Sequence, residues 1–391
     1  MNRRTHRRKF FRQAVAVSAL SAVAGKDAAT TSGQTTQQDS GIVIWLGHTD
    51  LNRIAENMAK CADHGFRTVY VEPRYVGKAL YHSKVVALFD SMYALSTKKD
   101  LSDALRRFDP YDVSVREAKR HGLRFIAEIS IFDRWFPGLE DRFYEQHPQY
   151  LMLHKDQGGL PYPGVPCYAE KAAQDYCLAE VKELVGRGAE GIAFDMGSHQ
   201  IGWTPPGRRY QGQADSFGFN PPVVEEFKRR YGVDVQKESF DKKKWYALQG
   251  EFFTQFLRRV KAEIKETRLE VGVTPEGYLG YGAQPHWTGS HGAFSQAPAV
   301  RIDLEWQKWL QEGIVDVLRV YVGPNGPFGP YYLAVAEAMK RQSARGRFYL
   351  HVRGIAPAEL CPLASQVRAS TLDGYSVAHS GLDFPPCAEA R

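Results

Sequence analysis

The segment Gly191-Ile192-Ala193-Phe194-Asp195 decides the fold that the sequence predicts. It is a short apolar run that ends on a carboxylate, and it follows a helix-like stretch that stops at the glycines Gly186 and Gly188. In parallel α/β folds, the carboxyl ends of the strands open onto the face where functional residues collect. Asp195 is therefore a candidate for chemistry, provided that the rest of the chain repeats this order of elements.

The order of helix, glycine and short apolar strand does recur along the chain. Eight strands are predicted, over residues 42–46, 68–71, 124–128, 191–195, 269–274, 315–320, 348–351 and 374–378. Helical spacing of apolar residues predicts helices over residues 51–64, 112–121, 172–187, 221–231, 245–265, 303–312, 331–344 and 357–369. This alternation predicts an α/β fold, a closed (β/α)8 TIM barrel. A doubly wound open sheet is the alternative, but no glycine-rich dinucleotide fingerprint follows the first strand.

The strand-to-helix connections after strands two to five are long, and helices are inserted between strands four and five. Long loops on one face of a barrel form a substrate cleft. The aromatic rings of these loops suit stacking on pyranose faces, although for any single ring packing of the loop onto the barrel is the favoured interpretation. These rings belong to Trp135, Tyr144, Tyr150, Tyr162, Tyr168, Trp203, Tyr210, Phe217, Phe219, Tyr278, Tyr281 and Trp287.

The net charge of +7 is concentrated at the N-terminus of the 391-residue chain. Six basic residues supply most of it, namely Arg3, Arg4, Arg7, Arg8, Lys9 and Arg12. The rest of the chain is therefore close to neutral and lacks the basic surface of a nucleic-acid-binding protein. We expect no nucleic-acid partner.

The basic head precedes a short apolar run over residues 14–25 that ends in Ala22-Val23-Ala24. This pattern predicts a removable secretory signal, too short for a stable membrane anchor. Arg7-Arg8 followed by Lys9-Phe10-Phe11 resembles the twin-arginine export signal of bacteria, whose partner is the export machinery. We therefore expect a signal peptide at 1–25, a flexible spacer at 26–40, a barrel at 41–391, and a periplasmic or extracellular location. A disordered basic tail is the alternative.

Five cysteines are present, at positions 61, 167, 177, 361 and 387, without the spacing of zinc ligands. Neither a metal site nor a disulfide framework is inferred, and no cofactor is expected. Cys61 and Cys361 lie in helix-like segments and are interpreted as small core residues. A bond between Cys167 and Cys177 is left open.

Several segments of the body resemble a known group of proteins. Residues 109–112 (DPYD), 147–151 (HPQYL), 217–227 (FGFNPPVVEEF), 230–234 (RYGVD) and 306–316 (WQKWLQEGIVD) look like those of bacterial glycosyl-hydrolase-like barrel proteins allied to glycoside hydrolase family ten. The resemblance covers residues 41–382. It implies a (β/α)8 barrel and action on a polysaccharide or oligosaccharide, so that the expected partner is a carbohydrate substrate.

A more distant similarity is to the α-amylase clan, in which an aspartate ends strand four and a glutamate ends strand five. Asp195 and Glu276 occupy those places. The sequence departs from that clan because Ala193 stands where the clan has an arginine. The seventh strand also ends His351-Val352-Arg353, without the usual aspartate.

Glycoside hydrolysis generally uses two carboxylates, one as acid and one as nucleophile or base. Asp195 and Glu276 are the first candidate pair, and Glu128 at the end of strand three is the alternative acid. Other polar or aromatic residues near strand ends or in the loops are expected to bind substrate, or else to hold the mouth of the barrel together. They are His48, Glu72, Arg74, Asp133, Trp135, Trp203, Tyr278, Arg319, Tyr321, His351 and Arg353.

Three functions remain open from the sequence. The first is a secreted glycoside hydrolase, and the second is a catalytically silent barrel that binds carbohydrate. The third is a metal-dependent hydrolase, which is disfavoured because the chain has no His-x-His or His-Glu-x-x-His cluster.

Overall fold

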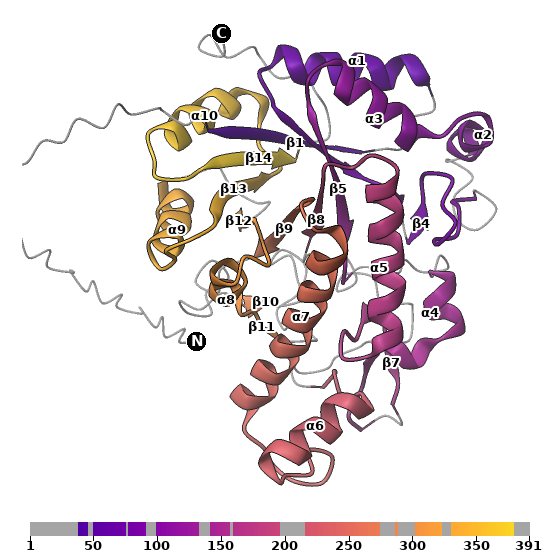
Figure 1. Ribbon diagram of the computed structural model, residues 1–391, viewed down its shortest axis with the longest axis vertical. Coiled ribbons are helices and arrows are strands. Elements are labelled where there is room, and N and C mark those ends of the chain that lie inside the picture. The colour runs from indigo at the N-terminus through magenta and orange to yellow at the C-terminus, as the bar shows by residue number, and fades with distance from the viewer. Residues whose placement is uncertain are drawn as a thin grey trace, which may run out of the picture. The chain divides into compact units, whose positions relative to one another are not determined.

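The computed structural model describes residues 38–45, 50–75, 77–90, 99–132, 141–156, 159–195, 216–273, 286–287, 302–322 and 330–378. Eight strands form a closed barrel in the order β1-β14-β13-β12-β9-β8-β5-β2, and every neighbouring pair is parallel. The predicted (β/α)8 barrel is thereby confirmed (Figure 1). The strands are β1 (Asp39–Trp45), β2 (Thr68–Glu72), β5 (Arg124–Ser130), β8 (Gly191–Asp195), β9 (Arg268–Val273), β12 (Val317–Val322), β13 (Arg347–Arg353) and β14 (Gly374–Ala378).

The helices that follow the strands begin and end where side chains complete the backbone hydrogen bonding. Asp50 caps the helix Leu51–Asp63 by accepting from the backbone N–H of Asn52. Asp109 caps the helix Pro110–Arg120, in which Pro110 takes the first helical position. The described helices after β strands are α1 (Leu51–Asp63), α3 (Pro110–Arg120), α5 (Lys171–Gly186), α7 (Lys242–Ile264), α8 (Trp306–Gln311), α9 (Pro330–Arg341) and α10 (Leu360–Arg368), the last preceded by the 3-10 turn η6 (Pro357–Glu359).

The insertion between β8 and β9 consists of α6 (Pro221–Tyr231) followed by α7. Figure 1 shows α6 at the far end of α7 from the barrel strands. The rings of Phe227 on α6 and Trp245 on α7 lie 5.4 Å apart, and both are fully buried. Gly232 ends α6 in the left-handed conformation, with φ of 71°, which a glycine adopts without strain.

The long connections also contain elements that periodicity did not reveal. The structure adds α2 (Lys99–Arg107), α4 (Arg142–Gln146) and the 3-10 turn η3 (Pro148–Tyr150). It adds three small antiparallel pairs, β3 (Arg74–Tyr75) with β4 (Lys78–Ala79), β6 (Leu151–Leu153) with β7 (Pro161–Pro166), and β10 (His286–Trp287) with β11 (Ile302–Asp303). These short pieces fold the connections back over the barrel.

Six of the twelve aromatic loop residues have described side chains, and five of these six rings are buried in the loops. Phe219 stacks on Trp245 with their ring centroids 4.7 Å apart, and Tyr162 meets Phe217 at the same distance. The packing interpretation is therefore correct for the five rings that are buried, Tyr144, Tyr162, Tyr168, Phe217 and Phe219. Asn220, in the FGFNPP segment, is also buried and bonds the backbone of Leu151 and Leu153, which ties the start of α6 to β6.

Two further expectations are corrected, and one question that the sequence left open is answered. The first strand begins at Asp39, so two residues assigned to the spacer belong to the barrel. Cys167 and Cys177 are both buried free thiols, so they do not form a disulfide. Cys61 is a buried core residue as predicted, whereas Cys361 is disulfide-bonded and only partly buried. Within the described part of the chain, no helix is both long and apolar enough to cross a membrane.

Candidate functional site

The mouth of the barrel contains an ion pair between the last residues of two strands. Asp195 ends β8 and Arg353 ends β13, and an Nη2–H of Arg353 donates to Oδ2 of Asp195. Asp195 is 1% exposed, whereas the side chain of Arg353 is 20% exposed. Although burial opposes its charged form, the Asp195 carboxylate raises the pKa of Arg353. The two side chains therefore form a charge-assisted ion pair at the mouth, in which only Arg353 is partly exposed.

Tyr321 of β12 completes this end of the barrel. Its side chain lies against the backbone of Gly272 in β9, so closely that a Cβ there would be 2.5 Å from Cζ of Tyr321. The guanidinium of Arg353 lies 5.4 Å from the centre of the ring. Burial, and then the charge of Asp195, raise the pKa of Tyr321, so the phenol stays protonated. Its buried hydroxyl has no hydrogen-bond partner among the described residues.

Below this layer, a second set of polar residues crosses the barrel. Arg319 of β12 donates to Oε2 of Glu128 in β5, and Nη2 of Arg319 lies 2.8 Å from Nδ1 of His351 in β13. Because a guanidinium only donates, Nδ1 of His351 accepts, and the proton of the neutral ring is on Nε2. Oγ of Ser376 in β14 is also 2.8 Å from that nitrogen. Arg319, Glu128, His351 and Ser376 are all buried.

A third layer lies toward the amino ends of the strands. Tyr70 of β2 donates to Oε2 of Glu270 in β9 at 3.0 Å, and the guanidinium of Arg319 lies 4.2 Å from the centre of the Tyr70 ring. Arg268 forms an ion pair with Glu270 at 2.6 Å and another with Asp39 at 3.2 Å. The polar residues inside the barrel thus form a continuous column from the amino ends of the strands to the mouth.

The structure brings together several of the predicted site residues. Asp195, Tyr321 and Arg353 share the mouth, and Glu72 lies close enough for its charge to raise the pKa of Arg353. Glu128 and His351 lie one layer deeper, with Arg319 between them. Their spacing along the strands accounts for this arrangement, because residues two apart point to the same side of a strand.

Arg74 is the exception among the described candidates. Its guanidinium binds Asp141, the N-cap of α4, at 2.8 Å and Glu180 of α5 at 2.5 Å. Its charge therefore joins loop segments outside the barrel, which agrees with the structural role given as the alternative to substrate binding. The remaining candidates, His48, Asp133, Trp135, Trp203, Glu276 and Tyr278, lie outside the described residues.

Sequence reasoning did not find Tyr70, Glu270 or Ser376, which line the interior beneath the mouth. Each lies in a predicted strand, but a buried polar residue inside a barrel breaks the usual apolar pattern and gives no signal of its own. The described residues contain no group of three or more His, Cys, Asp and Glu side chains that could hold a metal ion.

The chain was compared with known proteins. No family model matches it, and no curated protein matches it. Among solved structures it is similar to a β-galactosidase from the psychrophilic Marinomonas ef1, with a TM-score of 0.52 and 11% sequence identity, covering 87% of this chain and 53% of that chain. It is also similar to a β-galactosidase from Bacillus circulans sp. alkalophilus, with a TM-score of 0.53 and 10% identity, covering 88% of this chain and 50% of that chain.

The chain spans about half the length of these galactosidases. At such low sequence identity, the similarity shows that the barrel fold is shared with glycoside hydrolases and leaves the reaction open.

Proposed function

We propose that this protein is a glycoside hydrolase in which Asp195 is one of two catalytic carboxylates. The observation that carries the proposal is the position of Asp195 at the barrel mouth, ion-paired with Arg353 and beside the buried hydroxyl of Tyr321. An ionised carboxylate can serve as nucleophile or as general base. A protonated tyrosine whose hydroxyl has no partner among the described residues can donate a hydrogen bond to a sugar oxygen or to the carboxylate itself.

Glu276 is proposed as the second carboxylate, because it follows strand β9 in the sequence and β9 is next to β8 in the barrel. The separation of the two carboxyl groups would define the stereochemistry. A gap of about 5 to 5.5 Å corresponds to retention, and one of about 6.5 to 9.5 Å to inversion. The anomer formed first, followed by NMR during hydrolysis, distinguishes these outcomes.

Glu128 is less well suited to be the acid. One of its oxygens is bound by Arg319, and its side chain is almost completely buried. This oxygen is therefore occupied inside the barrel, one layer below Asp195. We assign Glu128 a positioning role, in which it holds Arg319 and through it His351.

Two observations support a polysaccharide or an oligosaccharide as the substrate. The barrel fold is shared with galactosidases, and several segments resemble glycosyl-hydrolase-like proteins allied to family ten. A catalytically silent carbohydrate-binding barrel is the second candidate, and it is favoured by the deep burial of Asp195. A metal-dependent hydrolase is the third candidate that the sequence leaves open, and added chelator tests it.

The test is a screen of the purified chain against bacterial, algal and plant polysaccharides, with release of reducing ends as the measurement. The Asp195→Asn variant is the matched control, since it removes the charge and keeps the shape of the side chain. Release by the wild-type chain alone supports the proposal. Binding of a polysaccharide without release by either chain supports the silent barrel and contradicts the hydrolase.

We further propose that the protein is exported through the twin-arginine route, with cleavage after about Ala24. The disulfide bond of Cys361 supports an oxidising compartment, because disulfides persist outside the reducing cytosol. Replacing Arg7 and Arg8 by lysines should leave the precursor in the cytoplasm of the native host. Mass spectrometry of the exported protein should find no residues 1–12, and their presence on the mature protein would contradict cleavage.

A further inference from the structure

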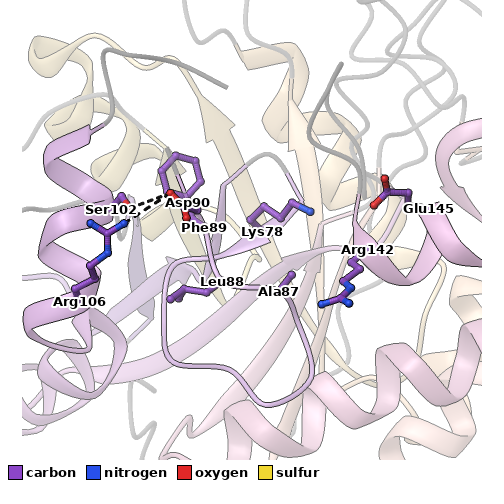
Figure 2. A pocket seen from close by; sticks show the side chains of 9 residues that line it. All are labelled: Lys78, Ala87, Leu88, Phe89, Asp90, Ser102, Arg106, Arg142 and Glu145. Atoms are coloured by element: carbon purple, nitrogen blue, oxygen red, sulfur yellow. Dashed lines mark hydrogen bonds and ion pairs between the residues drawn. The ribbon is translucent and has the colours of Figure 1, made fainter. Parts of the chain in front are cut away.

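A pocket of about 520 Å³ lies between the connection that follows β2 and the connection that follows β5. Figure 2 shows its walls, with Lys78 of β4 and the segment 87–90 on one side, α2 on another, and α4 on the third. Both connections leave the carboxyl ends of barrel strands, the end at which Asp195 lies. The volume is within the range of small-molecule sites in proteins, about 300 to 1,000 Å³.

Two of the walls of this pocket, the β3–β4 hairpin and α4, are joined by Arg74. Its guanidinium bonds Glu180 through two nitrogens, at 2.5 and 2.6 Å, and Asp141 at 2.8 Å. Tyr176 donates to the other oxygen of Asp141 at 2.7 Å. Since Arg74 belongs to β3 and Asp141 caps α4, this cluster joins the hairpin wall to the helix wall. The pocket is therefore formed before any ligand arrives.

The polar groups of the pocket include three cations from three different elements. They are Lys78 of β4, which is 7% exposed, Arg106 of α2 and Arg142 of α4. Two acids also line it. Asp90 accepts from Ser102 at 3.4 Å and lies 3.9 Å from Arg106, so its charge is largely compensated.

The other acid, Glu145, lies one turn from Arg142 on α4, and no ion pair joins the two. Within the described part of the chain, the exposed guanidinium of Arg142 has no ion-pair partner at all. With three cations and two acids in its lining, the pocket carries a net positive charge, and Glu145 partly offsets the charge of Arg142. The apolar edge is Leu88, which is 41% exposed.

We propose that this pocket is a subsite for an acidic sugar unit, one that carries a carboxylate or a sulfate group. The anionic group would lie between Lys78 and Arg142, and the C–H face of the sugar would lie on Leu88. The inference rests on the proposed function for the idea that the ligand is a saccharide, but the pocket and its charges are independent of Asp195.

The test measures binding by calorimetry with two matched probes, α-1,4-linked trigalacturonate and α-1,4-linked galactotriose. Binding of a sulfated galactotriose and of inorganic sulfate is measured in the same way. The Asp195→Asn chain is used so that no probe is consumed, and a parallel activity screen on the wild-type chain keeps the two proposals apart. We expect at least one anionic trisaccharide to bind more tightly than galactotriose, with an affinity that falls as salt is added.

The decisive comparison is between two variants on α4, each of which replaces a charged residue by glutamine. One removes a positive charge and the other removes a negative charge. Arg142→Gln should weaken binding of the anionic trisaccharide about fivefold, the upper end of what one solvent-exposed charge contributes. Glu145→Gln should strengthen it about twofold to threefold, because a repelling charge is removed. Arg341→Gln at the end of α9 makes the same change at an exposed position outside the pocket and should have no effect.

Several results would overturn the subsite. Equal affinity for the neutral and anionic trisaccharides, or the same response from Arg142→Gln and Arg341→Gln, would show that the pocket does not select acidic sugars. Weakening by both Arg142→Gln and Glu145→Gln would indicate a neutral ligand. Binding of inorganic sulfate as tight as that of the sugars would reduce the pocket to an ion site, and no binding of any probe would dismiss it.

Discussion

The guanidinium of Arg319 donates to Oε2 of Glu128 inside the barrel, where neither side chain reaches solvent. The two residues come from β12 and β5, which are not neighbours, so the pair spans the barrel interior. An ion pair removed from water in this way stabilises the fold only while both partners are present. Glu128 is therefore expected to matter for folding before it matters for chemistry.

Glu128→Gln should lower the free energy of unfolding by about 3 to 5 kcal/mol, because it leaves the Arg319 charge buried without a counter-charge. Urea unfolding followed by circular dichroism measures this loss. The opposite result, an intact stability with a lost activity, would make Glu128 the catalytic acid and displace Glu276 from that role.

Asp195→Asn and Glu276→Gln should each reduce turnover by about two orders of magnitude or more, while binding of the substrate persists. The charge chemistry is removed and the shape of each side chain is kept. Initial rates and calorimetric binding on the same polysaccharide give the two quantities. Full activity in either variant would exclude that residue from the catalytic pair.

Tyr321→Phe should lower turnover and leave the protein equally stable or slightly more stable. The change deletes a buried hydroxyl that has no partner among the described residues, and such a group costs free energy on folding. Because burial and the Asp195 charge raise the pKa of Tyr321, any fall in rate on the alkaline side should be the same in wild type and variant. A pH–rate profile of both proteins tests this, and a lost alkaline limb in the variant would contradict it.

Gly272→Ala should destabilise the barrel by about 1 to 3 kcal/mol, since the new methyl group would overlap the ring of Tyr321. The double variant with Tyr321→Leu should recover part of that loss, because the smaller side chain leaves room for the methyl group. Thermal unfolding of the two single variants and the double variant gives the coupling between the positions. Strict additivity of the losses would show that the two side chains do not meet.

Asp39 should make the stability depend on acid pH. Burial acts in the other direction, but the hydrogen bond from Tyr349 and the charges of Arg124 and Arg268 lower the pKa of Asp39 below its ordinary value of 3.8. The stabilisation is therefore present above the unfolded pKa and is lost as the pH falls through the lower, folded pKa.

Asp39→Asn should consequently reduce the free energy of unfolding at neutral pH and flatten its decline below about pH 4. Urea unfolding at several pH values checks this, with Asp63→Asn at the exposed end of α1 as the control. An unchanged slope in the Asp39 variant would mean that its ion pairs contribute nothing to folding.

The fold was predictable because its repeated units follow local rules. The bounds of β8, α6 and β14 agree with the sequence prediction, since glycines and apolar runs mark them clearly. Helix α8 begins at Trp306 and not at residue 303, because Ile302 and Asp303 pair with β10. Short elements such as α4 and β3 were missed because a few residues carry no period.

The candidate site was predictable only in part. The position of Asp195 at a strand end follows from the repeat, as does the inward direction of Tyr321 and Arg353. The choice of partners does not, because Arg319 could have paired with any acid in the barrel. Arg74 shows the same limit, since its two acidic partners lie on α5 and at the start of α4, far away in sequence. Pairing of this kind is decided by the closure of the barrel.

The pairing of β1 with β14 joins Asp39–Val43 to Gly374–Ala378, so the seam of the barrel closes with the last strand to be synthesised. Until then the growing sheet has two open flanks with unpaired backbone groups, which are prone to aggregate. A premature stop before Gly374 would thus give an aggregating sheet and not a smaller barrel.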